Sequence, residues 1–258
     1  MDFRNRTAVV TGAAQGIGAA VVRALAERGA HVAALDIDAG GLAAMASGLC
    51  GEGHRVTPFA TDVRDSADVE QSIDRIERDL GPIDILVNVA GILRMESVAH
   101  LTDEDWAATF AVNTAGVFHL SRAVTKRMVP RRSGVVVTVG SNAATTPRMR
   151  MAAYAASKAA SAQFTKCLGL ELAQYGIRCN VVSPGSTDTA MQRQLWTDES
   201  GAEAVIRGDL DTHRLGIPLA RLADPADIAD AVVFLASDRA RHITMHDLRI
   251  DGGATPGG

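Results

Sequence analysis

A tyrosine and a lysine in the second half of the chain have the spacing of a proton-transfer pair. Tyr154 and Lys158 are four residues apart, so they share one face if their segment is helical. A phenol with a pKa near about 10 is a poor base at neutral pH, but a neighbouring ammonium favours the phenolate and lowers that pKa. Ser141 comes 13 residues earlier, where its hydroxyl could hydrogen-bond the same substrate oxygen. These residues predict removal of a proton from an alcohol as hydride leaves the carbon.

A glycine-rich turn near the start of the chain predicts where the hydride acceptor binds. Residues Thr11–Gly18 follow an apolar run and open an Ala-rich segment. Gly12 and Gly16 tolerate unusual backbone angles and leave no Cβ facing a ligand, and Gly18 lets the helix pack closely on the sheet. The free N–H groups of that helix suit a pyrophosphate. The expected dinucleotide contacts in this turn are Gly12, Gln15, Gly16, Ile17 and Gly18.

Asp36 predicts which dinucleotide binds. It ends the second apolar run, about 20 residues after the turn, where a carboxylate accepts hydrogen bonds from the adenosine ribose. The carboxylate would repel a 2′-phosphate, and Ile37 beside it supplies no compensating cation. Asp38 is the more natural cap for the next helix. The sequence therefore favours NAD over NADP as cofactor.

Two further segments fall at the ends of apolar runs. Asp62-Val63 follows the third run, and Asn88-Val89-Ala90-Gly91 follows the fourth. Ligands of open α/β sheets bind at the carboxyl ends of the strands. We expect Asp62 and Val63 near the adenine, and Asn88, Ala90 and Gly91 where the backbone approaches the ribose.

Short apolar runs alternate with amphipathic or Ala-rich segments along the whole chain. The predicted strands are Thr7–Thr11, His31–Asp36, Arg55–Thr61, Ile83–Asn88, Gly134–Gly140, Ile177–Ser183 and Leu248–Asp251. The predicted helices are Gly16–Arg28, Ala39–Cys50, Ser66–Leu80, Thr102–Val129, Ala152–Gln174 and Pro225–Ala236. This alternation predicts an α/β Rossmann fold: a doubly wound, seven-stranded parallel sheet flanked by helices. We expect one domain over residues 1–258, with a partly helical substrate lid at 187–216.

Composition excludes several other classes. The net charge of −4 argues against a nucleic-acid partner, and the pairs Lys126-Arg127 and Arg131-Arg132 suit helix ends. The three cysteines are widely spaced and predict neither a disulfide framework nor a metal site. No apolar run approaches about 18 residues, so we expect no membrane span. A cytoplasmic protein is the simplest interpretation.

Taken together, these motifs resemble those of the short-chain dehydrogenases/reductases over essentially the whole chain. The matching segments are Thr11–Gly18, Asn88–Gly91, Asn113, Ser141, Tyr154 with Lys158, and Pro184-Gly185. The resemblance implies a catalytic group of Asn113, Ser141, Tyr154 and Lys158, in which Asn113 holds a water that links Lys158 to solvent. It also implies cofactor contacts from Tyr154, Lys158, Pro184, Gly185, Thr187 and Thr189, and assembly as a homotetramer. Val89 departs from the family's usual residue, which affects only a turn.

Other stretches are more particular. Gly91–Met95, Thr109–Asn113, Val182–Thr189, Leu215–Leu219 and His242–Thr244 are similar to the branch of the family that oxidises 2,3-dihydro-2,3-dihydroxybenzoate at its C3 hydroxyl. The ketone so formed tautomerises to 2,3-dihydroxybenzoate, a siderophore precursor. A carboxylate substrate favours arginine ligands. The expected substrate contacts are Arg94 and Arg148 first, then Arg150, Met191 and Gln192, with Ser141 at the reacting oxygen.

Three alternatives stay open at this point. The same oxidation of trans-2,3-dihydro-3-hydroxyanthranilate to 3-hydroxyanthranilate, in natural-product biosynthesis, uses the same ring, carboxylate and carbinol. Another ring alcohol or a 3-oxoacyl thioester is the more general enzymatic possibility, although Asp36 argues against the latter. A non-catalytic NAD-binding regulator is the third, and the intact catalytic group argues against it.

Overall fold

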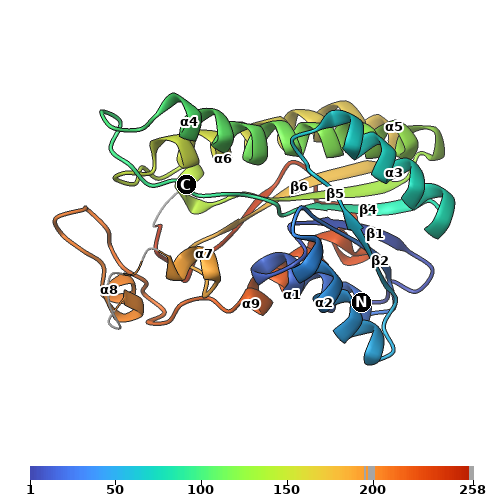
Figure 1. Cartoon of the computed structure of the whole chain (residues 1–258), viewed down its shortest axis with the longest axis horizontal. Coiled ribbons are helices and arrows are strands. Elements are labelled where there is room, and N and C mark those ends of the chain that lie inside the picture. Colours follow the sequence, from blue (N-terminus) through green and yellow to red (C-terminus); the bar gives the residue numbers. More distant parts are fainter. Residues whose placement is uncertain (195, 197–200, 256–258) are drawn as a thin grey trace.

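The seven strands of the described residues form one parallel sheet. The computed structural model describes residues 1–194, 196 and 201–255. The strands are β1 (Thr7–Thr11), β2 (His31–Asp36), β3 (Val56–Ala60), β4 (Ile83–Asn88), β5 (Gly134–Val139), β6 (Ile177–Pro184) and β7 (Asp247–Ile250). Their order in the sheet is β3-β2-β1-β4-β5-β6-β7, and every neighbouring pair is parallel (Figure 1). The predicted fold class is confirmed.

Helices cover both faces of this sheet (Figure 1). One layer contains α1 (Gly16–Glu27), α2 (Ala39–Gly51) and α9 (Pro225–Ala236), and the other contains α3 (Ser66–Leu80), α5 (Val117–Arg131) and α6 (Ala152–Leu172). Successive side chains of β1 enter opposite cores: Ala8 and Val10 pack with the first layer, and Val9 packs with the second. Burial on both faces explains why the central strands are apolar throughout.

Aspartates begin several of these helices. The Asp38 carboxylate accepts a hydrogen bond from the Gly41 N–H of α2 at 3.0 Å, as the sequence predicts. Asp65 caps α3 in the same way, and Asp224 forms a capping box at α9 with Asp227. Because Asp38 supplies the cap of α2, the nearby Asp36 is available for another role.

The prediction of one uninterrupted helix over 102–129 is wrong. The structure has α4 (Asp103–Phe110), a π-helical segment over Ala111–Gly116, and then α5. A π-helical turn changes the backbone hydrogen-bond register but leaves the apolar pattern almost intact, so the pattern does not reveal it. Asn113 lies within this segment. A smaller difference occurs at α6, which ends at Leu172 and continues as a 3₁₀ turn over Ala173–Tyr175.

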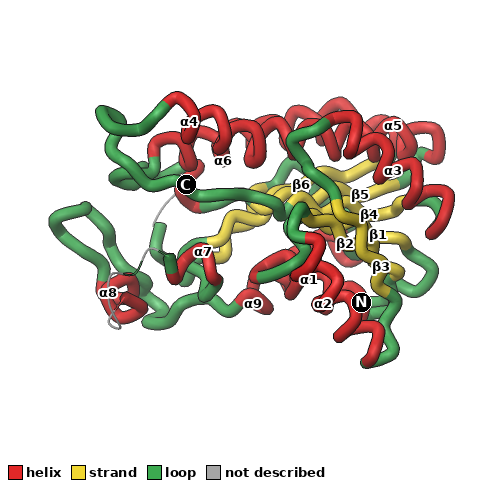
Figure 2. The backbone as a smooth tube through the Cα atoms, viewed as in Figure 1, coloured by secondary structure: helices red, strands yellow, loops and turns green. Residues whose placement is uncertain are grey.

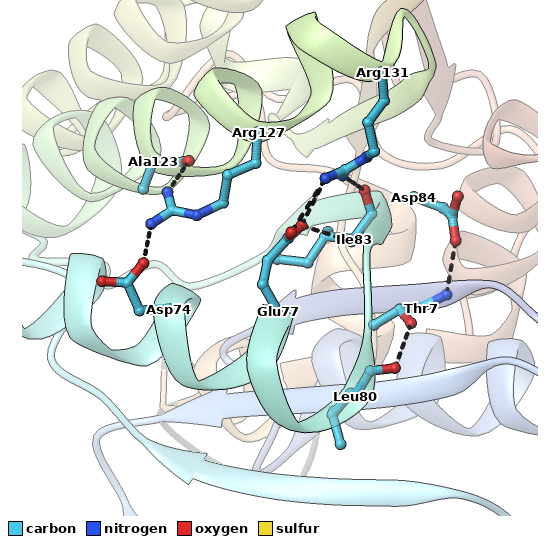
Figure 3. A network of polar contacts seen from close by, with 9 residues as sticks. All are labelled: Thr7, Asp74, Glu77, Leu80, Ile83, Asp84, Ala123, Arg127 and Arg131. Atoms are coloured by element: carbon cyan, nitrogen blue, oxygen red, sulfur yellow. Dashed lines mark hydrogen bonds and ion pairs between the residues drawn. The ribbon is translucent and has the colours of Figure 1, made fainter.

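Charged side chains join α3 to α5 (Figure 3). The Arg127 guanidinium pairs with Asp74, and Arg131 Nη1 lies 3.1 Å from both carboxylate oxygens of Glu77. Arg131 Nη2 also donates to the carbonyl oxygen of Ile83 at 2.8 Å. Two arginines of the basic pairs noted in the sequence are therefore used within the fold. No helix in the described part of the chain is long and apolar enough to cross a membrane.

Candidate active site

A pocket of about 940 Å³ opens at the carboxyl ends of the strands, beside the point where the strand order reverses between β1 and β4. Many of its lining residues lie in the segments that follow β1 to β6. Figure 2 draws the loops of these segments in green. The predicted site residues that line it are Gly12, Gln15, Gly16, Ile17, Gly18, Asp36, Ile37, Asp62, Val63, Ala90, Gly91, Arg94, Ser141, Arg148, Arg150, Tyr154, Lys158, Pro184, Gly185, Thr187, Thr189, Met191 and Gln192. Asn88 and Asn113 lie behind this wall.

The glycine turn is built by close backbone contacts. Gly12 has a φ of 63°, and a Cβ there would lie 2.8 Å from the Cα of Ala90. A Cβ on Gly18 would lie 1.8 Å from the carbonyl oxygen of Gly12. The unusual backbone angle expected at Gly12 is confirmed, and a Cβ is excluded there by the Ala90 turn, so this glycine is required where two turns meet. Thr11 joins the same turns, its Oγ1 accepting from the N–H groups of Val89 at 3.0 Å and Ala90 at 3.1 Å.

Two aspartates lie at the end of the pocket where the sequence predicts the adenosine. Backbone N–H groups of Ala14 and Asp38, each at 3.0 Å, hold the two carboxylate oxygens of Asp36 at the end of β2. Asp62 also lines this end, but its carboxylate pairs with Arg64, with Oδ2 2.6 Å from Nη2. Hydrogen bonding to Arg64 lowers the pKa of Asp62. Arg64 is thus already neutralised by its own neighbour.

Ser141, Tyr154 and Lys158 meet at the end of β5. The Lys158 ammonium is buried, donates to the carbonyl oxygen of Val139 at 2.8 Å, and lies 5.9 Å from the centroid of the Tyr154 ring. An ammonium has three donors, so two are left after the bond to Val139. Burial lowers the pKa of Lys158 to about 8. Burial raises the pKa of Tyr154, and a hydrogen bond with Ser141 opposes that rise. In the protein alone, burial rather than the lysine charge dominates the pKa of this phenol.

Asn113 fastens the π-helical segment to α6. Its side-chain oxygen accepts from the N–H of Ile92 at 2.8 Å, and its nitrogen donates to the Ile92 carbonyl at 2.9 Å and to Ser157 Oγ at 3.0 Å. Ser157 lies between Tyr154 and Lys158 in α6, so this contact positions the helix that carries both. The bound water expected of Asn113 stays a prediction.

Asn88 is turned away from the pocket. Its amide nitrogen donates to Ser121 Oγ at 3.2 Å and to Thr138 Oγ1 at 3.4 Å, inside the core between the sheet and α5. The structure therefore brings Ala90 and Gly91 of this turn to the pocket, but not the Asn88 side chain.

The arginines around the pocket fall into two groups. Arg94 pairs with Asp105 at 3.4 Å, and Arg150 with Glu96 at 3.9 Å. The Arg148 side chain makes no ion pair or hydrogen bond with the described residues, although its carbonyl oxygen accepts from the Met151 N–H at 3.3 Å. Arg214 also lines the pocket, and it is not among the residues predicted from the sequence, although the glycines at 208 and 216 could have marked a tight loop.

The segment expected to form a lid projects beyond the end of β6 (Figure 1). It contains two short helices, α7 (Ala190–Arg193) and α8 (Gly201–Arg207), and α7 brings Met191 and Gln192 to the pocket. Residues 195 and 197–200 of this segment lie outside the described residues. Among the residues that are described, no group of three or more His, Cys, Asp or Glu side chains could hold a metal ion.

Comparison with known proteins agrees with this geometry. Residues 6–200 match the short chain dehydrogenase family. The chain is 61% identical to 2,3-dihydro-2,3-dihydroxybenzoate dehydrogenase of Bacillus subtilis (strain 168), over 99% of this chain and 98% of that protein. It is 46% identical, over the full length of both chains, to the enzyme of the same name from Escherichia coli (strain K12).

Solved structures share the fold as well. A gluconate 5-dehydrogenase from Burkholderia cenocepacia J2315, in complex with NADP and tartrate, superposes with a TM-score of 0.91 at 32% identity, over 100% of this chain and 98% of that one. The strand order, the glycine turn and the Ser–Tyr–Lys arrangement thus occur in a sequence that matches one family over most of its length. The chain belongs to the short chain dehydrogenase family of oxidoreductases.

Proposed function

We propose that this protein oxidises the C3 hydroxyl of 2,3-dihydro-2,3-dihydroxybenzoate with NAD, giving 2,3-dihydroxybenzoate for siderophore synthesis. One observation carries the reaction type: Ser141, Tyr154 and Lys158 line the same pocket as the glycine turn. The names of the full-length relatives support the choice of substrate.

The residues of the pocket fit a dinucleotide. Gly12, Gly16 and Gly18 form the turn, and the first N–H groups of α1 suit a pyrophosphate. Pro184, Gly185, Thr187 and Thr189 line the pocket near the reaction centre, where a nicotinamide would be held. When bound, NAD supplies the hydride acceptor.

We assign the catalytic steps to side chains at the end of β5 and on α6. Ser141 holds the C3 oxygen and stabilises its developing charge, and Tyr154, as phenolate, removes the hydroxyl proton while hydride leaves C3. The Lys158 cation stabilises the phenolate. The resulting ketone then tautomerises: a proton leaves C2 to water, the C3 oxygen gains a proton from water, and the ring becomes aromatic.

The experiment that tests this proposal is a two-product assay. The protein is incubated with NAD and 2,3-dihydro-2,3-dihydroxybenzoate, and the reduced cofactor and 2,3-dihydroxybenzoate are measured together. We expect the two products in equal amounts. A parallel incubation uses trans-2,3-dihydro-3-hydroxyanthranilate, and faster turnover of that acid would move the proposal to the amino substrate. Turnover of neither acid would reject it, and cofactor binding without turnover of any ring alcohol would favour a regulatory role.

We infer that NAD is preferred over NADP. The carboxylate of Asp36 stands where it would accept bonds from the ribose hydroxyls and repel a 2′-phosphate, and Arg64, the cation at that end, pairs with Asp62. The structure solved with NADP is that of a gluconate 5-dehydrogenase, which is 32% identical to this chain.

Asp36→Ser is expected to lower the preference for NAD over NADP by about 10- to 100-fold, because the substitution removes both the ribose acceptor and the like charge. The measurement is the ratio of kcat/KM for the two cofactors at saturating substrate. Asp36→Asn, which keeps an acceptor oxygen but not the charge, separates the two contributions. An unchanged ratio in both variants would contradict this role for Asp36.

The substrate lid, the assembly and the location of the protein stay predictions. We propose that residues 187–216 close over the acid, with Met191 against the ring and Gln192 near its polar edge. We also expect a single domain, assembly as a homotetramer and a cytoplasmic location.

A further inference from the structure

Five arginines line the pocket, and they differ in what neutralises them. Arg64, Arg94 and Arg150 each lie within ion-pair distance of a carboxylate, namely that of Asp62, Asp105 and Glu96 respectively. The side chains of Arg94 and Arg150 are 53% and 57% exposed, so water also solvates their charges. The charges of these three guanidinium groups are therefore already compensated without a ligand anion.

Arg148 and Arg214 are different. Both are half-buried and line the pocket, yet neither forms an ion pair or a side-chain hydrogen bond within the described part of the chain. Burial lowers the pKa of each, and the charge of Arg214 lowers that of Arg148 further. Asp251 attracts Arg148 and Asp209 attracts Arg214, but neither carboxylate lies within ion-pair distance of its arginine. Two partly desolvated cations that repel each other are unfavourable until an anion lies between them.

The two arginines reach the pocket from separate loops. Arg148 lies in the loop between β5 and α6, six residues before Tyr154. Arg214 lies on the loop that follows α8. Figure 1 shows this loop at the outer edge of the molecule. A carboxylate between them would therefore link the catalytic side of the pocket to the segment expected to form the lid.

The loop of Arg214 has a defined shape. Asp209 and Arg214 exchange backbone hydrogen bonds, with the Asp209 N–H donating at 2.9 Å and the Arg214 N–H at 2.8 Å. A Cβ on Gly208, whose φ is +83°, would lie 2.4 Å from the Arg214 carbonyl oxygen, so the hairpin requires glycine there. The backbone that carries Arg214 is thus held in place without help from its guanidinium.

Neutral donors in the same pocket also lack partners. Gln192 Nε2 and Trp196 Nε1 are buried and make no hydrogen bond with the residues described. Together with the two guanidinium groups, they give this half of the pocket an excess of donors. Such a surface is complementary to an oxygen-rich anion.

We propose that Arg214, together with Arg148, binds the carboxylate of the substrate and so selects a ring acid over a neutral ring alcohol. This inference rests on the proposed function, and it places Arg214, rather than Arg94, beside Arg148. The guanidinium planes would share the two carboxylate oxygens. The cofactor pyrophosphate is the rival anion, but its expected place is the glycine turn at α1.

The test replaces Arg214 with leucine and compares acid and neutral ligands. We expect Arg214→Leu to raise the KM for 2,3-dihydro-2,3-dihydroxybenzoate by about 10- to 100-fold, the loss of one charge-assisted contact. Binding of 2,3-dihydroxybenzoate to the complex with reduced cofactor, measured by calorimetry, should weaken by the same factor. Binding of catechol, which lacks the carboxylate, should change less than about twofold, and so should the KM for NAD. Arg214→Lys should recover most of the affinity.

Arg207→Leu is the matched control. Arg207 is on α8 in the same segment, pairs with Glu203 and is 73% exposed, so we expect no change in any of these constants. Unchanged affinity for the acid in Arg214→Leu, or an equal loss for catechol, would overturn the inference. So would a loss of acid affinity in Arg94→Leu in place of Arg214→Leu, or a selective loss of NAD affinity.

The proposed function can fail separately. If the wild-type protein turns over no cyclohexadiene acid, but Arg214→Leu binds 2,3-dihydroxybenzoate more weakly than the wild type does, the carboxylate site stands and the substrate proposal falls. If it oxidises the acid and Arg214→Leu binds it normally, only the carboxylate site is rejected.

Discussion

Tyr154→Phe is expected to lower kcat for alcohol oxidation by about 10²- to 10⁴-fold, the range that general acid–base groups contribute. The substitution removes the oxygen that takes the substrate proton and leaves the ring in place. Ser141, Lys158 and the glycine turn are untouched, so the affinity for NAD should stay within a few-fold of wild type. Steady-state kinetics and cofactor titration measure the two quantities.

Tyr175→Phe is a suitable control for this experiment. Tyr175 is the only other tyrosine of the chain, and it lies in the 3₁₀ turn after α6, where the Arg132 guanidinium lies 5.6 Å from its ring centroid. It should retain normal turnover. Normal turnover in Tyr154→Phe would rule out the phenol as the base.

Lys158→Met is expected to lower kcat at neutral pH by about 10²-fold or more, because the phenolate loses the cation that stabilises it. The rise of kcat/KM with pH should move to higher pH in this variant, since the apparent pKa belongs to the coupled Tyr154–Lys158 pair. A pH profile of oxidation from pH 6 to about 10.5 shows this shift. An unmoved profile would contradict the assigned role of Lys158.

The same substitution should stabilise the protein. Burial lowers the pKa of Lys158 from its ordinary value of 10.5 to about 8 in the folded chain, so the buried cation costs stability at every pH below 8. Between pH 8 and 10.5 the unfolded chain still holds the proton that the folded chain has released, and wild-type stability therefore rises with pH in that window. Lys158→Met removes this dependence and should add about 1 to 2 kcal/mol near pH 7, after the loss of the bond to Val139.

Lys166→Met provides the comparison for both effects. Lys166 lies on the same helix, two turns later. Its ammonium is 3.9 Å from Asp247, and Lys166 is not among the residues that line the pocket. Its activity and its pH profile should match wild type. Lower stability of Lys158→Met near pH 7 would mean that the buried ammonium contributes more through its contacts than its burial costs.

Much of the scaffold can be predicted from the sequence because it follows from burial. Strands such as β1 and β5 are apolar on both faces, and their predicted bounds differ from the structure by at most one residue. The glycine turn is predictable for a related reason: Gly12 and Gly18 stand where no side chain fits. Both features depend on short stretches of sequence, because burial of a strand and the backbone angles of a turn are determined locally.

The parts that escaped prediction depend on contacts between distant segments. The π-helical segment around Asn113 is a change of hydrogen-bond register that the apolar period does not record. Whether an arginine is free for a ligand depends on which carboxylates the fold brings near it. Arg94 and Arg148 look alike in sequence, but of these two only Arg94 has a carboxylate, that of Asp105, within ion-pair distance among the described residues.

The origin of the transferred hydride is the most direct test of the proposed oxidation at C3. 2,3-Dihydro-2,3-dihydroxybenzoate carrying deuterium at C3 is oxidised with NAD. The reduced cofactor is isolated, and its mass is measured by mass spectrometry. Hydride transfer from C3 predicts one deuterium in each molecule of reduced cofactor. Substrate labelled at C2 should give none, because that label should pass to water as the ring becomes aromatic. Deuterium in the cofactor from C2, or its absence from the cofactor when C3 is labelled, would contradict the proposed chemistry.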